Sequence, residues 1–191
     1  TVSAGTLDPA TYTITGSGTN TLSVTGTILV DASTFAGNYA SFETRTLNTG
    51  STVNYKGTTQ TIDNLTYSNL TISGSATKTL AGATTVNSDL TVSAGTLDPA
   101  TYTITGSGAN TLSVTGTILV DASTFADNYA SFETRTLNSG STVNYKGTTQ
   151  TIDNLTYSNL TISGSATKTL AGATTVNSDL IVNSATTLDT S

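Results

Sequence analysis

Apolar and polar residues alternate along this chain in short runs of three to five residues. Typical triplets are Leu70-Thr71-Ile72, Leu90-Thr91-Val92 and Leu112-Ser113-Val114. A period of two is typical of β-strands, whose side chains point to opposite faces in turn. Gly, Ser and Ala cluster between the runs, and no stripe with helical spacing is present; even 125–137, the nearest candidate, lacks strong helix formers. The pattern predicts many short strands joined by turns, and no helix.

The chain consists of two almost identical copies of one segment. Residues 1–90 recur as 91–180, with three differences: Thr19 against Ala109, Gly37 against Asp127, and Thr49 against Ser139. Residues 181–191 begin a third copy and then depart from it. We therefore expect a first repeat at 1–90, a second at 91–180 that continues directly from it, and a divergent start of a further turn at 181–191.

Shorter echoes within each repeat indicate the architecture. The pattern that begins at Leu70 is echoed at Leu90 and again at Leu112. This spacing predicts an all-β fold, a right-handed parallel β-helix (β-solenoid) with about four turns of roughly 20–25 residues per repeat. With strands about 4.8 Å apart, the same faces should recur roughly every 19 Å. The alternative is a tandem array of β-sandwiches, but no linker separates Leu90 from Thr91.

Composition excludes several function classes. The chain has no Cys, His, Met or Trp, so disulfides, zinc fingers and thiol or imidazole catalysis are excluded. Only 9% of residues are charged and the net charge is −6, which argues against nucleic-acid binding. No apolar run approaches the ~20 residues of a membrane span. The chain opens on Thr1 rather than Met, so we expect a mature product or a segment of something longer.

Threonine makes up about a quarter of the chain, with 47 residues. β-branched side chains suit a pleated surface, and outward threonines are expected to form ladders from turn to turn. Flat threonine arrays are also a way to order water, so ice binding is an alternative function. The Thr-x-Thr triplets begin at Thr11, Thr25, Thr44, Thr59 and Thr77. Their spacing does not match the turns, which argues against one flat array.

The charged residues offer few candidate sites. The acidic side chains of one repeat are far apart in sequence and lack calcium-loop spacing, so we expect no metal site: Asp8, Asp31, Glu43, Asp63 and Asp89. Glu43, Arg45, Lys56 and Asp63 could meet on neighbouring turns and act on a polysaccharide. The simpler interpretation is isolated surface charges or a weak ion pair. Asp121 and Asp127 are the nearest approach to a paired site, in the second repeat only.

Aromatic residues gather in the least regular part of the repeat. Phe35, Tyr39 and Phe42 all lie within 31–45, which also contains the Gly37/Asp127 difference. One interpretation is a protruding loop whose rings stack on sugars or on a partner. The other, which we favour, is that the rings fill a wider turn of the core.

A series of segments covers essentially the whole repeat: Gly50-Ser51-Thr52-Val53-Asn54-Tyr55, Gln60-Thr61-Ile62, Asn64 to Gly74, Lys78-Thr79-Leu80 and Leu90 to Asp98. Together these segments resemble a repeat found in very large secreted bacterial surface and adhesin-like proteins. The resemblance implies an extracellular, stalk-like β-solenoid on the cell surface and transfers no catalytic residue.

Together these observations favour a structural, non-enzymatic role. We expect a segment of an extracellular filament or adhesin stalk with no cofactor, homotypic end-to-end or lateral contacts, and possible contact with surface polysaccharide. A carbohydrate-binding or carbohydrate-cleaving β-helix and an ice-binding solenoid are the alternatives.

Overall fold

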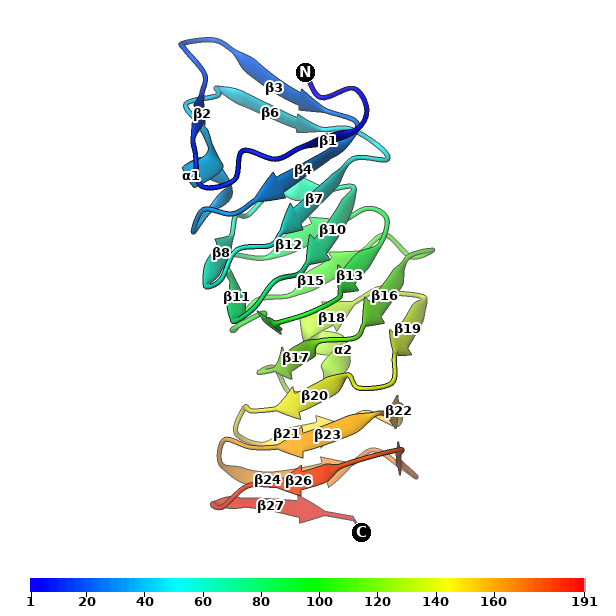
Figure 1. Ribbon diagram of the computed structural model, residues 1–191. Coiled ribbons are helices and arrows are strands. Elements are labelled where there is room, and N and C mark those ends of the chain that lie inside the picture. Colours follow the sequence, from blue (N-terminus) through cyan, green and yellow to red (C-terminus); the bar gives the residue numbers. More distant parts are fainter. Residues whose placement is uncertain (191) are drawn as a thin grey trace.

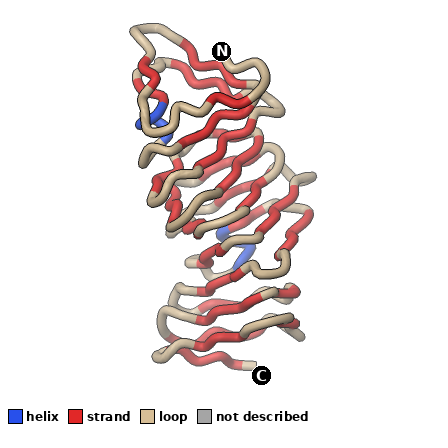
Figure 2. The backbone as a smooth tube through the Cα atoms, viewed as in Figure 1, coloured by secondary structure: helices blue, strands red, loops and turns tan. Residues whose placement is uncertain are grey.

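The computed structural model describes residues 1–190, which form a long column with the two termini at opposite ends (Figure 1). Within these residues 27 short strands and two four-residue helices follow one another along the chain. The backbone winds around the column axis, and strands of successive wraps lie across the column one below the other (Figure 2). Three strands make one wrap, so the described residues form about nine wraps.

Three faces of the column are obtained by taking every third strand. Face I contains β1 (Thr6–Leu7), β4 (Thr27–Val30), β7 (Thr52–Tyr55), β10 (Asn69–Ile72), β13 (Leu90–Val92), β16 (Thr111–Val114), β19 (Thr134–Leu137), β22 (Thr156–Tyr157) and β25 (Thr175–Val176). Face II contains β2 (Ile14–Thr15), β5 (Tyr39–Ala40), β8 (Gln60–Ile62), β11 (Thr77–Leu80), β14 (Thr96–Asp98), β17 (Thr117–Val120), β20 (Thr142–Tyr145), β23 (Asn159–Ile162) and β26 (Leu180–Val182). Face III contains β3 (Thr21–Val24), β6 (Thr44–Leu47), β9 (Thr66–Tyr67), β12 (Thr84–Val86), β15 (Ile104–Gly106), β18 (Tyr129–Ala130), β21 (Gln150–Ile152), β24 (Ala166–Leu170) and β27 (Thr186–Asp189).

All pairing between these strands is parallel and joins a strand to the one three places later. A β-sandwich would pair strands in antiparallel fashion, so the fold is the predicted β-solenoid. The register joins Thr27 to Thr52, Thr52 to Asn69 and Leu70 to Leu90. These wraps have unequal lengths, and the one from Thr52 to Asn69 is shorter than the predicted range.

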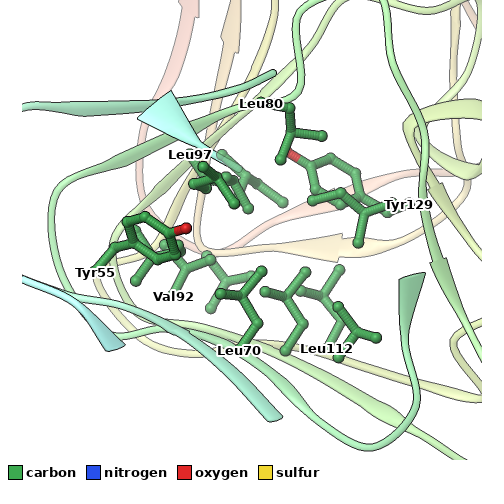
Figure 3. Close-up of a cluster of buried hydrophobic side chains, with 14 of the residues drawn as sticks. Tyr55, Leu70, Leu80, Val92, Leu97, Leu112 and Tyr129 are labelled. Atoms are coloured by element: carbon green, nitrogen blue, oxygen red, sulfur yellow. The ribbon is translucent and has the colours of Figure 1, made fainter. Parts of the chain in front are cut away.

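The core is a thin stack of inward side chains. Strands such as β10 alternate between half-exposed and buried residues, as the period of two predicts. Leu70, Leu90 and Leu112 lie in register on successive wraps and are fully buried. Figure 3 shows Leu70, Val92, Leu97 and Leu112 pointing into the interior. Each wrap is covered by its neighbours, so burial of these aliphatic side chains holds the column together.

The repeat does not contain a whole number of wraps. β1 recurs in the second repeat as β14, thirteen strands on, so one repeat makes four and a third wraps. Its copies change face: β4, β7 and β10 lie in one sheet, whereas β17, β20 and β23 lie in the next. About four turns per repeat is confirmed. The expectation that the same face recurs with each repeat is wrong, because the extra strand turns the second repeat by a third of a turn.

The prediction of no helix is also wrong, since one wrap in each repeat carries a single helical turn. These are α1 (Phe35–Asn38) and α2 (Phe125–Asn128), the second at the start of the segment that lacked strong helix formers. Thr34 caps α1 by accepting a hydrogen bond from the Gly37 amide. The buried Asn38 side chain then accepts from the amides of Asp31 and Ala32. Local capping thus forms a turn too short for periodicity to reveal.

The divergent start of the third copy keeps the fold. Leu188 pairs with Lys168 as Leu97 pairs with Lys78, although Leu188 lies one position beyond an exact copy of Leu97. The one extra residue therefore lies in the turn before β27. Residue 191 is outside the described part of the chain.

Candidate interaction surfaces

Outward side chains form columns along the faces, because parallel strands are stacked in register. On face II, Thr77, Thr96, Thr117 and Thr142 follow one another and lead to Asn159. A second column on face I runs through Thr71, Thr91, Ser113 and Thr136. The threonine ladders expected from the composition are thus present, and they are uncharged, hydrogen-bonding surfaces.

Only some of the Thr-x-Thr triplets lie beside another triplet on the neighbouring wrap. Those at β8 and β11 are in register, since Gln60 pairs with Lys78 and Thr61 with Thr79. The triplet in β6 pairs with Thr21 and Ser23 instead. Asp98 follows Thr79 in the same column, and the triplet that begins at Thr11 lies outside any strand. Threonine pairs therefore form small patches on different faces.

Lys56 is at the centre of a charged cluster on one corner of the column. Its ammonium lies 3.0 Å from a carboxylate oxygen of Asp8 and 3.0 Å from one of Asp31. The three residues follow β7, β1 and β4, so the cluster spans three successive wraps. The hydrogen bonds that the Lys56 ammonium donates to the carboxylates of Asp8 and Asp31 raise the pKa of Lys56. Lys146, Asp98 and Asp121 repeat the arrangement on face II. These half-exposed pairs link wraps and contribute modestly to stability.

The four candidate polysaccharide residues are not brought together. Asp63 accepts a hydrogen bond from the backbone N–H of Phe35 at 2.6 Å. The Arg45 guanidinium lies over the Phe35 ring, 5.6 Å from its centroid. Lys56 is held by two aspartates, and Glu43 is exposed beside β6. A glycosidase needs two carboxyl groups facing one bond, whereas the Asp63 carboxylate is engaged by the Phe35 amide and Glu43 lies exposed beside β6.

Asp121 and Asp127 also serve separate purposes. Asp121 pairs with Lys146 at 2.9 Å. Asp127 completes a capping box at α2, because its carboxylate accepts from the Thr124 amide while Thr124 accepts from the amide of Asp127. They therefore form no paired acidic site.

The aromatic residues of 31–45 fill the wide wrap rather than protrude. Phe35 and Tyr39 are fully buried, with ring centroids 5.0 Å apart, and the Tyr39 hydroxyl donates to the carbonyl of Leu29. Phe42 is half-buried against the core. This confirms the core-filling interpretation and excludes Phe35 and Tyr39 as sugar-stacking platforms.

A buried polar network lies under α1, in the next wrap. The hydroxyls of Tyr55 and Tyr67 are 3.0 Å apart, and Tyr67 donates to the carbonyl of Asp63 at 2.7 Å. The Asp63 amide donates to the Tyr55 hydroxyl at 3.1 Å. Burial raises the pKa of both tyrosines above the ordinary value of about 10. The sequence signal was the inward position of both rings in strands of period two.

Two buried lysines were missed by the sequence analysis. Lys78 and Lys168 are inward residues with no exposed surface. The Lys168 ammonium donates to the carbonyls of Gly147, Thr148 and Ser165 at 2.7, 2.5 and 2.6 Å, which uses all three of its N–H bonds. Lys78 donates to the carbonyl of Ser75. Burial lowers the pKa of both. The sequence did contain a signal for this burial: Lys78 lies two residues before the inward Leu80, and residues two apart in a strand point to the same face.

The described residues form no pocket and no cluster of three or more potential metal-binding side chains. No helix among them is long and apolar enough to cross a membrane. A scan against protein-family models finds no match, and searches of curated proteins and of solved structures find none either.

Proposed function

We propose that this chain is a structural, non-enzymatic segment of an extracellular filament or adhesin stalk that projects or spaces binding elements. The observation that carries the proposal is the stacking of near-identical repeats into one column, with polar residues engaged in holding wraps together. In such a column each wrap contacts only its neighbours, so length can grow without a new core. Length is the property that a stalk requires.

The extracellular, cell-surface and bacterial parts of the proposal come from the resemblance to adhesin-like repeats. The lack of Cys supports export, because a long chain secreted unfolded forms no incorrect disulfides. No cofactor is required for a mechanical role.

End-to-end contact is the partner interaction that we propose first. In the last wrap Leu180, Ile181 and Val182 are 50%, 49% and 44% exposed. Their counterparts Leu90 and Val92 are fully buried, because β16 covers β13. A strand of a second copy or of a continuing chain that took the place of β16 would bury this apolar edge in the same way. Lateral contacts and contact with a surface polysaccharide are weaker proposals.

The test is to display arrays of two, four and eight repeats on a bacterial surface with a binding module at the tip. A stalk predicts that tip height, measured by electron microscopy, increases by about 21 Å per repeat at about 4.8 Å per wrap. Constant height at any repeat number would contradict the stalk.

A matched activity assay separates the alternatives. Polysaccharide cleavage that is lost in the Glu43→Gln/Glu133→Gln double variant would favour an enzyme, and thermal hysteresis of the purified chain would favour ice binding. Intact polysaccharide and an ordinary freezing curve are the results that agree with a stalk.

A further inference from the structure

Strand pairing between successive wraps is complete along most of the column but is interrupted at two places. Of the 24 possible pairings between a strand and the strand three places later, 20 are formed in the described residues. The four that are not formed are β5 with β8, β6 with β9, β18 with β21, and β19 with β22. All four directly follow the wraps that carry α1 and α2. The interruptions are therefore a property of the repeat.

Each interruption leaves one face intact. At the first, β4 and β7 on face I pair along their whole length, from Thr27↔Thr52 to Val30↔Tyr55. The cause is a change of wrap length: the helix-bearing wrap runs from Thr27 to its partner Thr52, whereas the next wrap needs only the shorter stretch from Thr52 to Asn69. A short wrap cannot follow the outline of a long one on every face, and strand pairing is absent on the other two.

Side chains replace the missing backbone bonds on face II. The Gln60 amide donates to the carbonyls of Val30 and Ala32 at 2.8 and 2.7 Å, and Asp63 holds the Phe35 amide. Thr61 adds one backbone bond to Ser33 at 2.7 Å. On face III β6 and β9, both within the described residues, form no backbone pairing. The first interruption is thus continuous on face I, bridged on face II and open on face III, where β6 and β9 are unpaired. Beyond these two strands, at the corner with face I, the Gly50 amide donates to the Ser68 hydroxyl at 2.9 Å.

The second interruption has the same three parts, each moved by one face. β17 and β20 on face II are continuous. Gln150 bridges to Val120 and Ala122 on face III at 2.9 and 2.7 Å. β19 and β22 lie unpaired on face I. The strand that contains the Thr-Leu pair of the Thr-Leu-Asp sequence shows the rotation through three copies, because β1 lies on face I, β14 on face II and β27 on face III.

We infer that each repeat contains a one-sided joint, at which the column bends by opening the face without pairing, and that the bending direction turns by a third of a turn from one repeat to the next. Three repeats then bend in three directions, and a long array is flexible without a preferred side. The joint is a property of the column itself; its use in a stalk rests on the proposed function. The test below measures only the joint, so its failure leaves the stalk proposal standing.

The experiment places pairs of nitroxide labels on outward residues of the complete 191-residue chain, which has no native Cys. Thr21→Cys/Thr85→Cys spans the first joint on its open face, and Thr6→Cys/Asn69→Cys spans it on its continuous face. Both pairs are three wraps apart, about 14 Å. Dipolar EPR is expected to give a distance distribution about twofold broader for the open-face pair, because local motion is largest where backbone pairing is absent.

The second joint supplies the matched control for the rotation. Thr111→Cys/Thr175→Cys lies on face I, which is now the open face, and is expected to be broad; Thr96→Cys/Asn159→Cys on face II is expected to be narrow. Gln60→Ala should broaden only the Thr21/Thr85 pair. Equal widths on the two sides of a joint would overturn the inference, as would broad distributions on the same face at both joints.

Discussion

The wraps that carry helices and the wraps between them are built on different principles. Between β10 and β16 every strand pairs with the next wrap, and the core is a column of aliphatic side chains in register. Between the wrap that carries α1 and the next wrap, two of the three strand pairings are missing, and Gln60, Asp63 and buried tyrosines add side-chain hydrogen bonds there. The regular wraps are therefore tolerant of outward changes, whereas the helix-bearing wrap depends on individual side chains.

The largest expected effect tests whether the regular wraps contain most of the core stability. Leu70→Ala removes a fully buried side chain that is packed between two paired wraps, and should lower the free energy of unfolding by about 3 kcal/mol. Leu47→Ala, at the half-buried edge strand β6, should cost about 1 kcal/mol. Urea denaturation measures both. Equal losses would show that the edge strand is as tightly packed as the core.

An intermediate effect concerns the tyrosines under the helix. Above pH 10 the unfolded chain loses the Tyr67 proton while the folded chain keeps it, because burial raises the pKa of Tyr67 in the folded state. The contribution of Tyr67 to the free energy of unfolding is therefore complete below pH 10 and decreases as the pH rises above 10. Tyr67→Phe should make the dependence of the free energy of unfolding on pH less steep, by about 1.4 kcal/mol per pH unit.

Urea denaturation between pH 9 and pH 12 measures the slope. Tyr157→Phe, the copy in the second repeat, should have the same effect. An unchanged slope in both variants would mean that these hydroxyls titrate in the folded state as they do in the unfolded chain.

The smallest expected effect uses a natural difference between the repeats. α2 has a complete capping box, whereas α1 has Gly37 where Asp127 stands in the copy. Gly37→Asp should stabilise the first repeat by about 0.5–1 kcal/mol through the added bond to the Thr34 amide. Asp127→Gly is the reciprocal variant and should lower stability by a similar amount. A lower melting temperature for Gly37→Asp than for the unchanged chain would show that the surroundings of α1 do not accept the carboxylate.

The sequence predicted the fold because the duplication and the period-two pattern both survive in the structure. It did not predict the rotation of the second repeat. That depends on unequal wrap lengths, which are set by which residues turn corners. Ala76 and Ala100, for example, turn with positive φ although neither is glycine. Because such corners are not marked by glycine at regular intervals, the sequence does not reveal where each wrap ends.

Candidate surfaces were predicted less well than the fold. The outward threonine ladders follow from composition and stacking, and the burial of Phe35 and Tyr39 follows from their size. Lys78 was not expected inside, since a charged residue is rarely fully buried unless it is paired. The burial of the lysine is permitted by backbone carbonyls at the corners of the column, which accept hydrogen bonds from the ammonium group, as the three bonds of Lys168 show. The positions of backbone carbonyl groups cannot be inferred from a sequence pattern.

The third of a turn in each repeat has a consequence for how such a gene can lengthen. A duplicated segment need not encode a whole number of wraps; it need only end where the next strand begins. All three faces have apolar residues inside and hydroxyl-bearing residues outside, so a strand copied onto another face finds similar neighbours. Recombination can therefore add or remove repeats, and every strand of the longer protein still has a place in the column.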